Sequence, residues 1–93
     1  MRESPALDVL IALERRGARP AYHDPHVPVI HVDDLDLRSE PLTAERLAAA
    51  SAVIVVTAHK AVDYDLIAAH ARLVIDTRNA LGQRHAIGRV VKL

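Results

Sequence analysis

The residues best placed to do chemistry are Arg78 and its neighbours in the segment 76–81, DTRNAL. An apolar run precedes this segment and predicts a buried strand, so we expect Arg78 at the carboxyl edge of a sheet, where open α/β domains bind ligands. A guanidinium there can bind a phosphate through two parallel hydrogen bonds, or donate to a ribose or a base. The alternative is structural, because Arg78 can also pair with Asp76 or with a backbone carbonyl.

A second polar group, Arg2-Glu3-Ser4, comes directly before Pro5 and opens a predicted helix. The free N–H groups of a helix start can bind an anion, and Arg2 adds positive charge. Simple capping is the favoured interpretation, with Ser4 at the N-cap and Glu3 complementing the helix dipole. Arg2 is therefore a weaker candidate than Arg78 for contact with an anion.

Thr57, His59 and Lys60 end or follow the apolar run 52–57. The carboxyl ends of parallel strands share one edge of a sheet, so these residues are expected near Arg78. Contact of Thr57 and His59 with a substrate is one hypothesis, and a solvated loop is the favoured alternative.

The histidines around residue 25 do not predict a metal site. His23, His26 and His31 lack the helical i, i+4 spacing of metalloprotease ligands, and the chain contains no cysteine. Asp24 lies about 20 residues after a helix start, where dinucleotide folds keep a ribose-binding acid. No glycine-rich loop precedes it, so a His-Asp-Pro turn is favoured.

Composition excludes several classes of protein. Twelve basic and twelve acidic residues cancel, and the two tyrosines are the only aromatic residues, which disfavours nucleic-acid binding. The absence of cysteine excludes a thiolate nucleophile and disulfides. No apolar run is long enough to span a membrane and no signal peptide opens the sequence, so we expect a cytoplasmic protein without membrane contact.

Signals for helices and strands alternate along the 93 residues, which are enough for one domain. Ser4, Thr43 and Asp63 are expected to cap helices, and Gly17 to end the first of them. The predicted elements in chain order are a helix from Pro5, a strand 18–23, an extended piece 29–32, a loop 33–43, a helix 43–50, a strand 52–57, a helix 63–71, a strand 73–77, and a tail 87–93 that forms a last strand or a docking extension.

This order predicts an α/β fold: a three-layer, Rossmann-like domain with a mainly parallel sheet. A doubly wound half normally begins with a central strand, whereas this chain begins with a helix, so the first strand is missing from the pattern. Its place should lie between the strand around Ala21 and the strand Val53–Val56. The two strands can pair directly, the tail can fill the place, or a second copy can cover it; a homodimer is favoured.

Five segments in this order resemble one known family: RESPAL, RRGARP, AYHDPHVP, AVIVVTAHKAVDYDLI and LVIDTRNAL. Together, over about residues 2–81, they resemble the C-terminal domain of the UDP-glucose/GDP-mannose dehydrogenase family. The segments TAH, DYDLI and DTRNAL are most similar to the UDP-N-acetylhexosamine 6-dehydrogenases. At the strand end that reads TAH in this chain, UDP-glucose dehydrogenases more often carry a tryptophan.

The resemblance implies a role inside a larger enzyme. Enzymes of the family oxidise a sugar C6 alcohol to a carboxylate with NAD, through a thioester on a catalytic cysteine. Their N-terminal domain binds NAD with a GxGxxG loop, and their C-terminal domain closes over the UDP. This chain has no cysteine, no GxGxxG and no counterpart of the UDP-contacting lysine that precedes RESP in the family.

Residues 1–93 are therefore expected to form a single, incomplete UDP-sugar-binding domain that needs the NAD-binding and central domains for catalysis. Arg78 is the main predicted UDP contact, with Arg2, Thr57 and His59 as further candidates. No catalytic, cofactor-binding or metal-binding residue is predicted, and UDP binding by the chain alone is expected to be weak.

Two other classes remain open. One is a ligand-free module for interaction or self-association. The other is a receiver-like or nucleotide-binding regulatory domain. A receiver needs an acidic cluster after its first strand and a phosphoacceptor aspartate at the end of a later one. Asp33 and Asp34 lie in a predicted loop and fit that requirement poorly.

Overall fold

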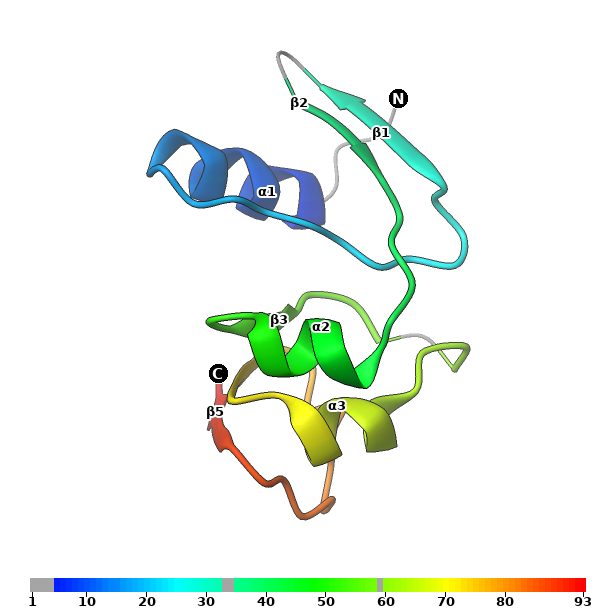
Figure 1. The fold of residues 1–93 in the computed structure, drawn as a ribbon, viewed down its shortest axis with the longest axis vertical. Helices are drawn as coiled ribbons and strands as arrows, with labels where there is room; N and C mark the ends of the chain where they lie inside the picture. Colours follow the sequence, from blue (N-terminus) through cyan, green and yellow to red (C-terminus); the bar gives the residue numbers. More distant parts are fainter. Residues whose placement is uncertain (1–4, 33–34, 59) are drawn as a thin grey trace. The chain divides into compact units, whose positions relative to one another are not determined.

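The structure is a computed structural model that describes residues 5–32, 35–58 and 60–93 (Figure 1). Its mixed α/β fold contains a parallel sheet and helices, as the alternating pattern predicts. The chain divides into two compact units, Met1–Pro41 and Leu42–Leu93. No helix within the described ranges has the length and apolar character needed to cross a membrane.

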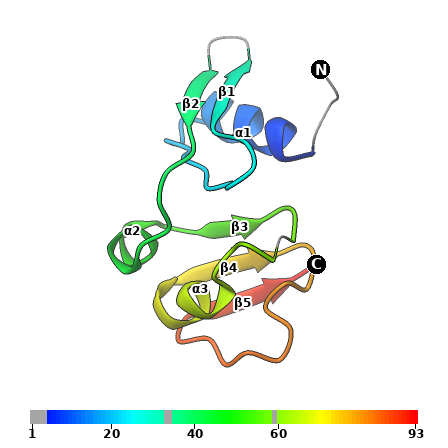
Figure 2. The same cartoon turned by 90° about the vertical axis from the view of Figure 1, so that its right-hand side faces the viewer.

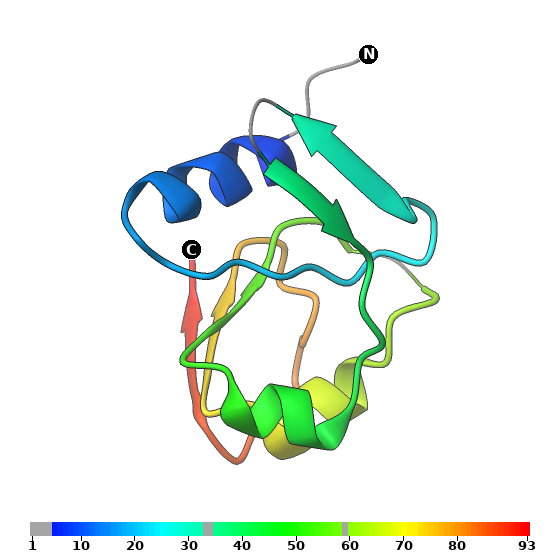
Figure 3. The ribbon, with the colours of Figure 1, turned by 45° about the horizontal axis from the view of Figure 1, so that its top comes forward.

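The first unit contains a helix and a hairpin (Figure 3). Helix α1 spans Pro5–Arg15, and Gly17 ends it with a φ of 87°, in the left-handed region where glycine is favoured. The hairpin joins β1 (Val29–Val32) to β2 (Leu35–Arg38) in antiparallel register. The predicted cap, Ser4, lies outside the described residues.

Two predictions in this unit are wrong. Residues 18–23 form no strand. The Tyr22 carbonyl accepts a hydrogen bond from the Glu40 N–H, but a single bond does not make a ladder. The predicted loop 33–43 contains β2, whose half-buried leucines alternate with the exposed Asp36 and Arg38. This alternation is the period of a strand, and it becomes stable because β1 supplies a partner.

The second unit contains a three-stranded parallel sheet, drawn side by side in Figure 2. Its order is β3 (Val53–Val55), β4 (Leu73–Asp76) and β5 (Arg89–Lys92). Helices α2 (Ala44–Ala49) and α3 (Tyr64–His70) contact each other and pack with the sheet. The buried core consists of Leu47, Val55, Ile67, Ala71, Val74 and Leu81.

The caps of the two short helices agree with the sequence. The Thr43 hydroxyl accepts a hydrogen bond from the Arg46 N–H at 3.2 Å. The Asp63 carboxylate accepts one from the Leu66 N–H at 3.0 Å. Each cap satisfies a backbone donor that the first turn leaves without a partner inside the helix.

The tail is a strand, as one of its two predictions states. It pairs with β4, on the side of that strand opposite β3, so it does not fill the place beside β3. Within the described ranges, β3 is therefore an edge strand of this sheet.

Gly88 brings β5 close to the end of α3. A Cβ atom at this position would meet the carbonyl oxygens of Ala71 and Arg72. The Arg72 carbonyl also accepts a hydrogen bond from the Arg89 N–H at 3.1 Å, at the start of β5. An added Cβ atom would thus meet only backbone atoms among its nearest neighbours, so rotation of a side chain could not relieve the overlap.

We predict that Gly88→Ala destabilises the protein by about 1–3 kcal/mol, the usual cost of overpacking. Urea unfolding measures the change. The control is Arg89→Ala, which removes an exposed side chain from the same strand and should have little effect. Equal stability of Gly88→Ala and the original chain would contradict the prediction.

Candidate functional site

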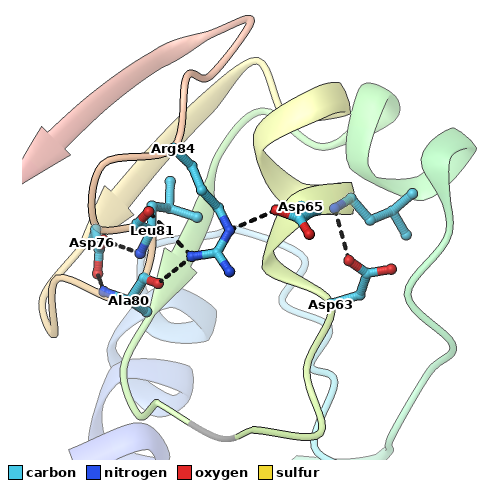
Figure 4. A network of polar contacts seen from close by, with 7 residues as sticks. Asp63, Asp65, Asp76, Ala80, Leu81 and Arg84 are labelled. Carbon is cyan, nitrogen blue, oxygen red and sulfur yellow. Dashed lines mark hydrogen bonds and ion pairs between the residues drawn. The ribbon is translucent and has the colours of Figure 1, made fainter.

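The end of β4 is organised by the buried carboxylate of Asp76, which is fully excluded from solvent. Its Oδ1 accepts hydrogen bonds from the N–H groups of Arg78 at 3.1 Å and Ala80 at 2.9 Å. Its Oδ2 accepts one from the Leu81 N–H at 3.0 Å (Figure 4). A single side chain thus determines the path of the loop that carries Arg78.

Two opposing effects act on the pKa of Asp76. Burial alone would raise this pKa, because it disfavours the charged form. The N–H donors of Leu81, Ala80 and Arg78, together with the positive charge of Lys92, favour the carboxylate and outweigh burial. The pKa of Asp76 therefore lies below its ordinary value, and the group is ionised at neutral pH.

The same loop is tied to the end of β3. The Thr77 hydroxyl donates to the Val55 carbonyl at 2.6 Å, and the Thr77 N–H donates to the same oxygen at 3.2 Å. The Arg78 Nε donates to the Val56 carbonyl at 3.0 Å. The structural alternative for Arg78 is thus partly observed, since its Nε bonds a carbonyl and its backbone N–H bonds Asp76.

Arg78 nevertheless keeps the means to bind a ligand. Its side chain is exposed, and the structure shows no bond from either terminal nitrogen to another described residue. The exposed Thr57 directly follows Val56, so the structure brings Thr57 and Arg78 to one sheet edge, as predicted. Arg2 and His59 lie outside the described residues.

A second arginine, Arg84, connects this loop to α3 (Figure 4). Its Nε donates to Asp65 at 2.7 Å, and its Nη1 donates to the carbonyls of Ala80 and Leu81, each at 3.3 Å. The guanidinium carbon lies 6.0 Å from the centre of the Tyr64 ring, within the range of a cation–π contact.

An open hollow of about 360 Å³ adjoins the loop at this edge. Apolar side chains provide part of its wall, and two cations contribute charge. It is lined by Ala58, Lys60, Val62, Tyr64, Ala80 and Arg84. Arginine and lysine side chains near a strand end suit the binding of an anion. The chain contains no cysteine.

The segment around Asp24 forms a turn, as favoured from the sequence. Asp24 Oδ1 accepts a hydrogen bond from the His26 N–H at 2.8 Å, and His23 Nδ1 lies 2.8 Å from the Glu40 carbonyl oxygen. Among the residues that the structure describes, no three histidine, aspartate or glutamate side chains gather as metal ligands.

Asp76, Arg84 and Lys92 are the site residues that the sequence analysis missed. Lys92 in β5 donates to the Gly82 carbonyl at 2.8 Å, so it holds the far end of the same loop. One signal for Asp76 exists in the sequence: an acid ends the apolar strand LVID. A buried acid needs hydrogen-bond donors, and the following peptide groups are the nearest ones.

The model of the UDP binding domain of the UDP-glucose/GDP-mannose dehydrogenase family matches residues 1–83. These residues include both strand ends and the Arg78 loop as far as Gln83. No curated protein and no solved structure matches the chain.

We predict that Asp76→Asn destabilises the fold by about 1–3 kcal/mol, because an amide cannot accept bonds on both sides and leaves a buried N–H without a partner. Urea unfolding measures this loss. The control is Asp63→Asn, an exposed position where asparagine caps a helix as well as aspartate does.

The loss of stability caused by Asp76→Asn should depend on pH. The folded pKa of Asp76 is lowered, so its stabilisation is fully present above the unfolded pKa of about 3.9. It disappears as pH falls through the folded pKa. The difference in stability between the original chain and Asp76→Asn should therefore shrink below about pH 4. A difference that stays constant at acid pH would contradict this account.

Proposed function

The chain belongs to the UDP-glucose/GDP-mannose dehydrogenase family, and on this basis we propose that the edge where β3 and β4 end binds the UDP part of a nucleotide sugar. The observation that carries the proposal is the geometry of Arg78. Its Nε is anchored on the Val56 carbonyl at 3.0 Å, and its terminal nitrogens have no bond to the other described residues. An anchored guanidinium loses less freedom when it binds the diphosphate.

Other candidates adjoin this arginine. Thr57 can donate a hydroxyl hydrogen to the ligand from the end of β3. Arg2 and His59 remain candidates on the sequence alone. With so few contacts, the chain by itself should bind UDP weakly, with a dissociation constant of roughly 1 mM, or about 4 kcal/mol.

We further propose the reaction that this binding serves. In the full-length enzyme, an NAD-binding domain and a central domain with a catalytic cysteine oxidise the C6 alcohol of the sugar to a carboxylate. A UDP-N-acetylhexosamine is the proposed substrate, and a cytoplasmic enzyme of polysaccharide biosynthesis is the proposed setting. Residues 1–93 act there as one domain, without a catalytic residue or cofactor of their own.

We predict that Arg78→Ala weakens UDP binding at least about tenfold, because charge-assisted hydrogen bonds contribute about 1.5–3 kcal/mol each. NMR titration of the full chain with UDP measures the affinity. Arg72→Ala, which removes another exposed arginine of the same unit, is the control and should bind normally. UDP-induced shifts that persist unchanged in Arg78→Ala would show that Arg78 is not the anchor.

A second candidate function, self-association, is favoured by β3. The Val55 carbonyl bonds Thr77, and alternate residues of a strand direct their backbone groups to opposite sides, so the N–H and C=O of Ile54 face away from β4. An apolar edge strand of this kind is a template for pairing with another chain. We propose a homodimer that pairs along β3.

We predict that light scattering gives a dimer mass at high protein concentration. The Ile54 amide should exchange slowly with solvent in the dimer, because a second strand then accepts its hydrogen bond. Ile54→Pro removes that donor and should give a monomer, since proline cannot join the ladder. A monomer at all concentrations would contradict the proposal.

A further inference from the structure

The peptide groups of Ala80 and Leu81 are held by opposite charges from two sides. Their N–H groups donate to the buried Asp76 carboxylate, at 2.9 and 3.0 Å. Their carbonyl groups accept from Nη1 of Arg84, at 3.3 Å each. Figure 4 shows these two residues between Asp76 and Arg84. The backbone N–H and C=O groups of two successive residues are thus all engaged by charged side chains.

Arg84 is itself held in orientation. Its Nε bonds Asp65 of α3 at 2.7 Å, and its guanidinium lies over the Tyr64 ring of the same helix. The buried Ile67 anchors α3 in the core. The planar fork of one arginine therefore connects a packed helix to the loop, which a flexible ammonium group could not do with the same geometry.

Stability alone does not explain this arrangement. The side chains of Arg84 and Asp65 are 41% and 84% exposed, and ion pairs with this exposure contribute little to the free energy of folding. Their effect should instead be on the conformation of the loop, where the two carbonyl contacts act.

That conformation places Arg78. Asn79, between Arg78 and Ala80, has a φ of 54°, in the left-handed region, where residues other than glycine are uncommon and asparagine is enriched. The Leu81 carbonyl also accepts the Arg84 backbone N–H at 3.0 Å, so loss of the Arg84 side chain would release the Ala80 carbonyl. Asn79 could then relax, and the backbone at Arg78 would turn. The bond from Arg78 Nε to the Val56 carbonyl would then be lost.

We propose that Arg84 is a positioning residue for UDP binding: it fixes the loop so that Arg78 presents its guanidinium at the sheet edge. This inference rests on the proposed function, and it assigns a role to a residue just beyond the match to the family, which ends at residue 83. Asp65 orients Arg84, and neither residue is assigned contact with the ligand.

The test compares Arg84→Ala, Arg84→Lys and Asp65→Asn with the control Arg72→Ala in the full chain. NMR reports three quantities: the Arg78 Nε–H signal, the affinity for UDP, and the exchange of the Ile67 and Val74 amides in the core. Arg84→Ala should shift the Arg78 Nε–H signal toward that of a free arginine and weaken UDP binding roughly three- to tenfold, while core exchange stays unchanged.

The substitutions separate geometry from charge. Arg84→Lys keeps a cation opposite Asp65 but loses the fork, so it should restore only part of the affinity. Asp65→Asn should have a smaller effect in the same direction. A merely structural role would speed the exchange of the core amides together with the loss of affinity, and that result would overturn the proposal.

Unchanged Arg78 Nε–H and UDP affinity in Arg84→Ala would also overturn it. If the original chain does not bind UDP, the proposed function fails. The Arg78 Nε–H signal then tests the positioning role by itself. A changed chemical shift in Arg84→Ala supports this role, and an unchanged chemical shift overturns it.

Discussion

The second unit depends on one interaction: the buried carboxylate of Asp76 accepts hydrogen bonds from three backbone N–H groups that follow it. These bonds turn the chain at the end of β4 and seat Leu81, which is fully buried, in the core. Lys92 of β5 adds positive charge and bonds the Gly82 carbonyl. The sheet, the core and the loop that carries Arg78 thus all contact the same buried charge.

A charge in this position is stable only because its partners are complete. An isolated buried carboxylate would be expensive, and its pKa would rise until it became neutral. Here both oxygens have donors, and the pKa is lowered instead. The donors belong to the loop, so the loop cannot leave without exposing a buried charge that has lost its partners. That coupling stabilises the turn through the two left-handed residues of the loop, Asn79 and Gly82.

Local signals predicted much of this unit from the sequence. Thr43 and Asp63 mark helix starts, and the apolar runs around Val55 and Val74 mark strands, because caps and burial act within a few residues. Contacts between segments that are far apart in the sequence could not be predicted from local signals. In the first unit, residues 18–23 form no ladder with any other segment that the structure describes. Arg84 gains its role only where the loop meets α3, and no spacing rule connects it to Asp65 across 19 positions.

The arrangement also explains why binding and chemistry would be divided between domains. Every strong charge beneath the loop is used internally: Asp76 on amides, Arg84 on carbonyls and Asp65, Lys92 on a carbonyl. Arg78 combines an internal anchor with terminal nitrogens that bond no other described residue. One such cation can orient a diphosphate but cannot enclose it, whereas small-molecule sites usually bury most of the surface of their ligand. If UDP binds as proposed, a second surface is needed to cover it, and in the proposed enzyme that surface also carries the reactive groups.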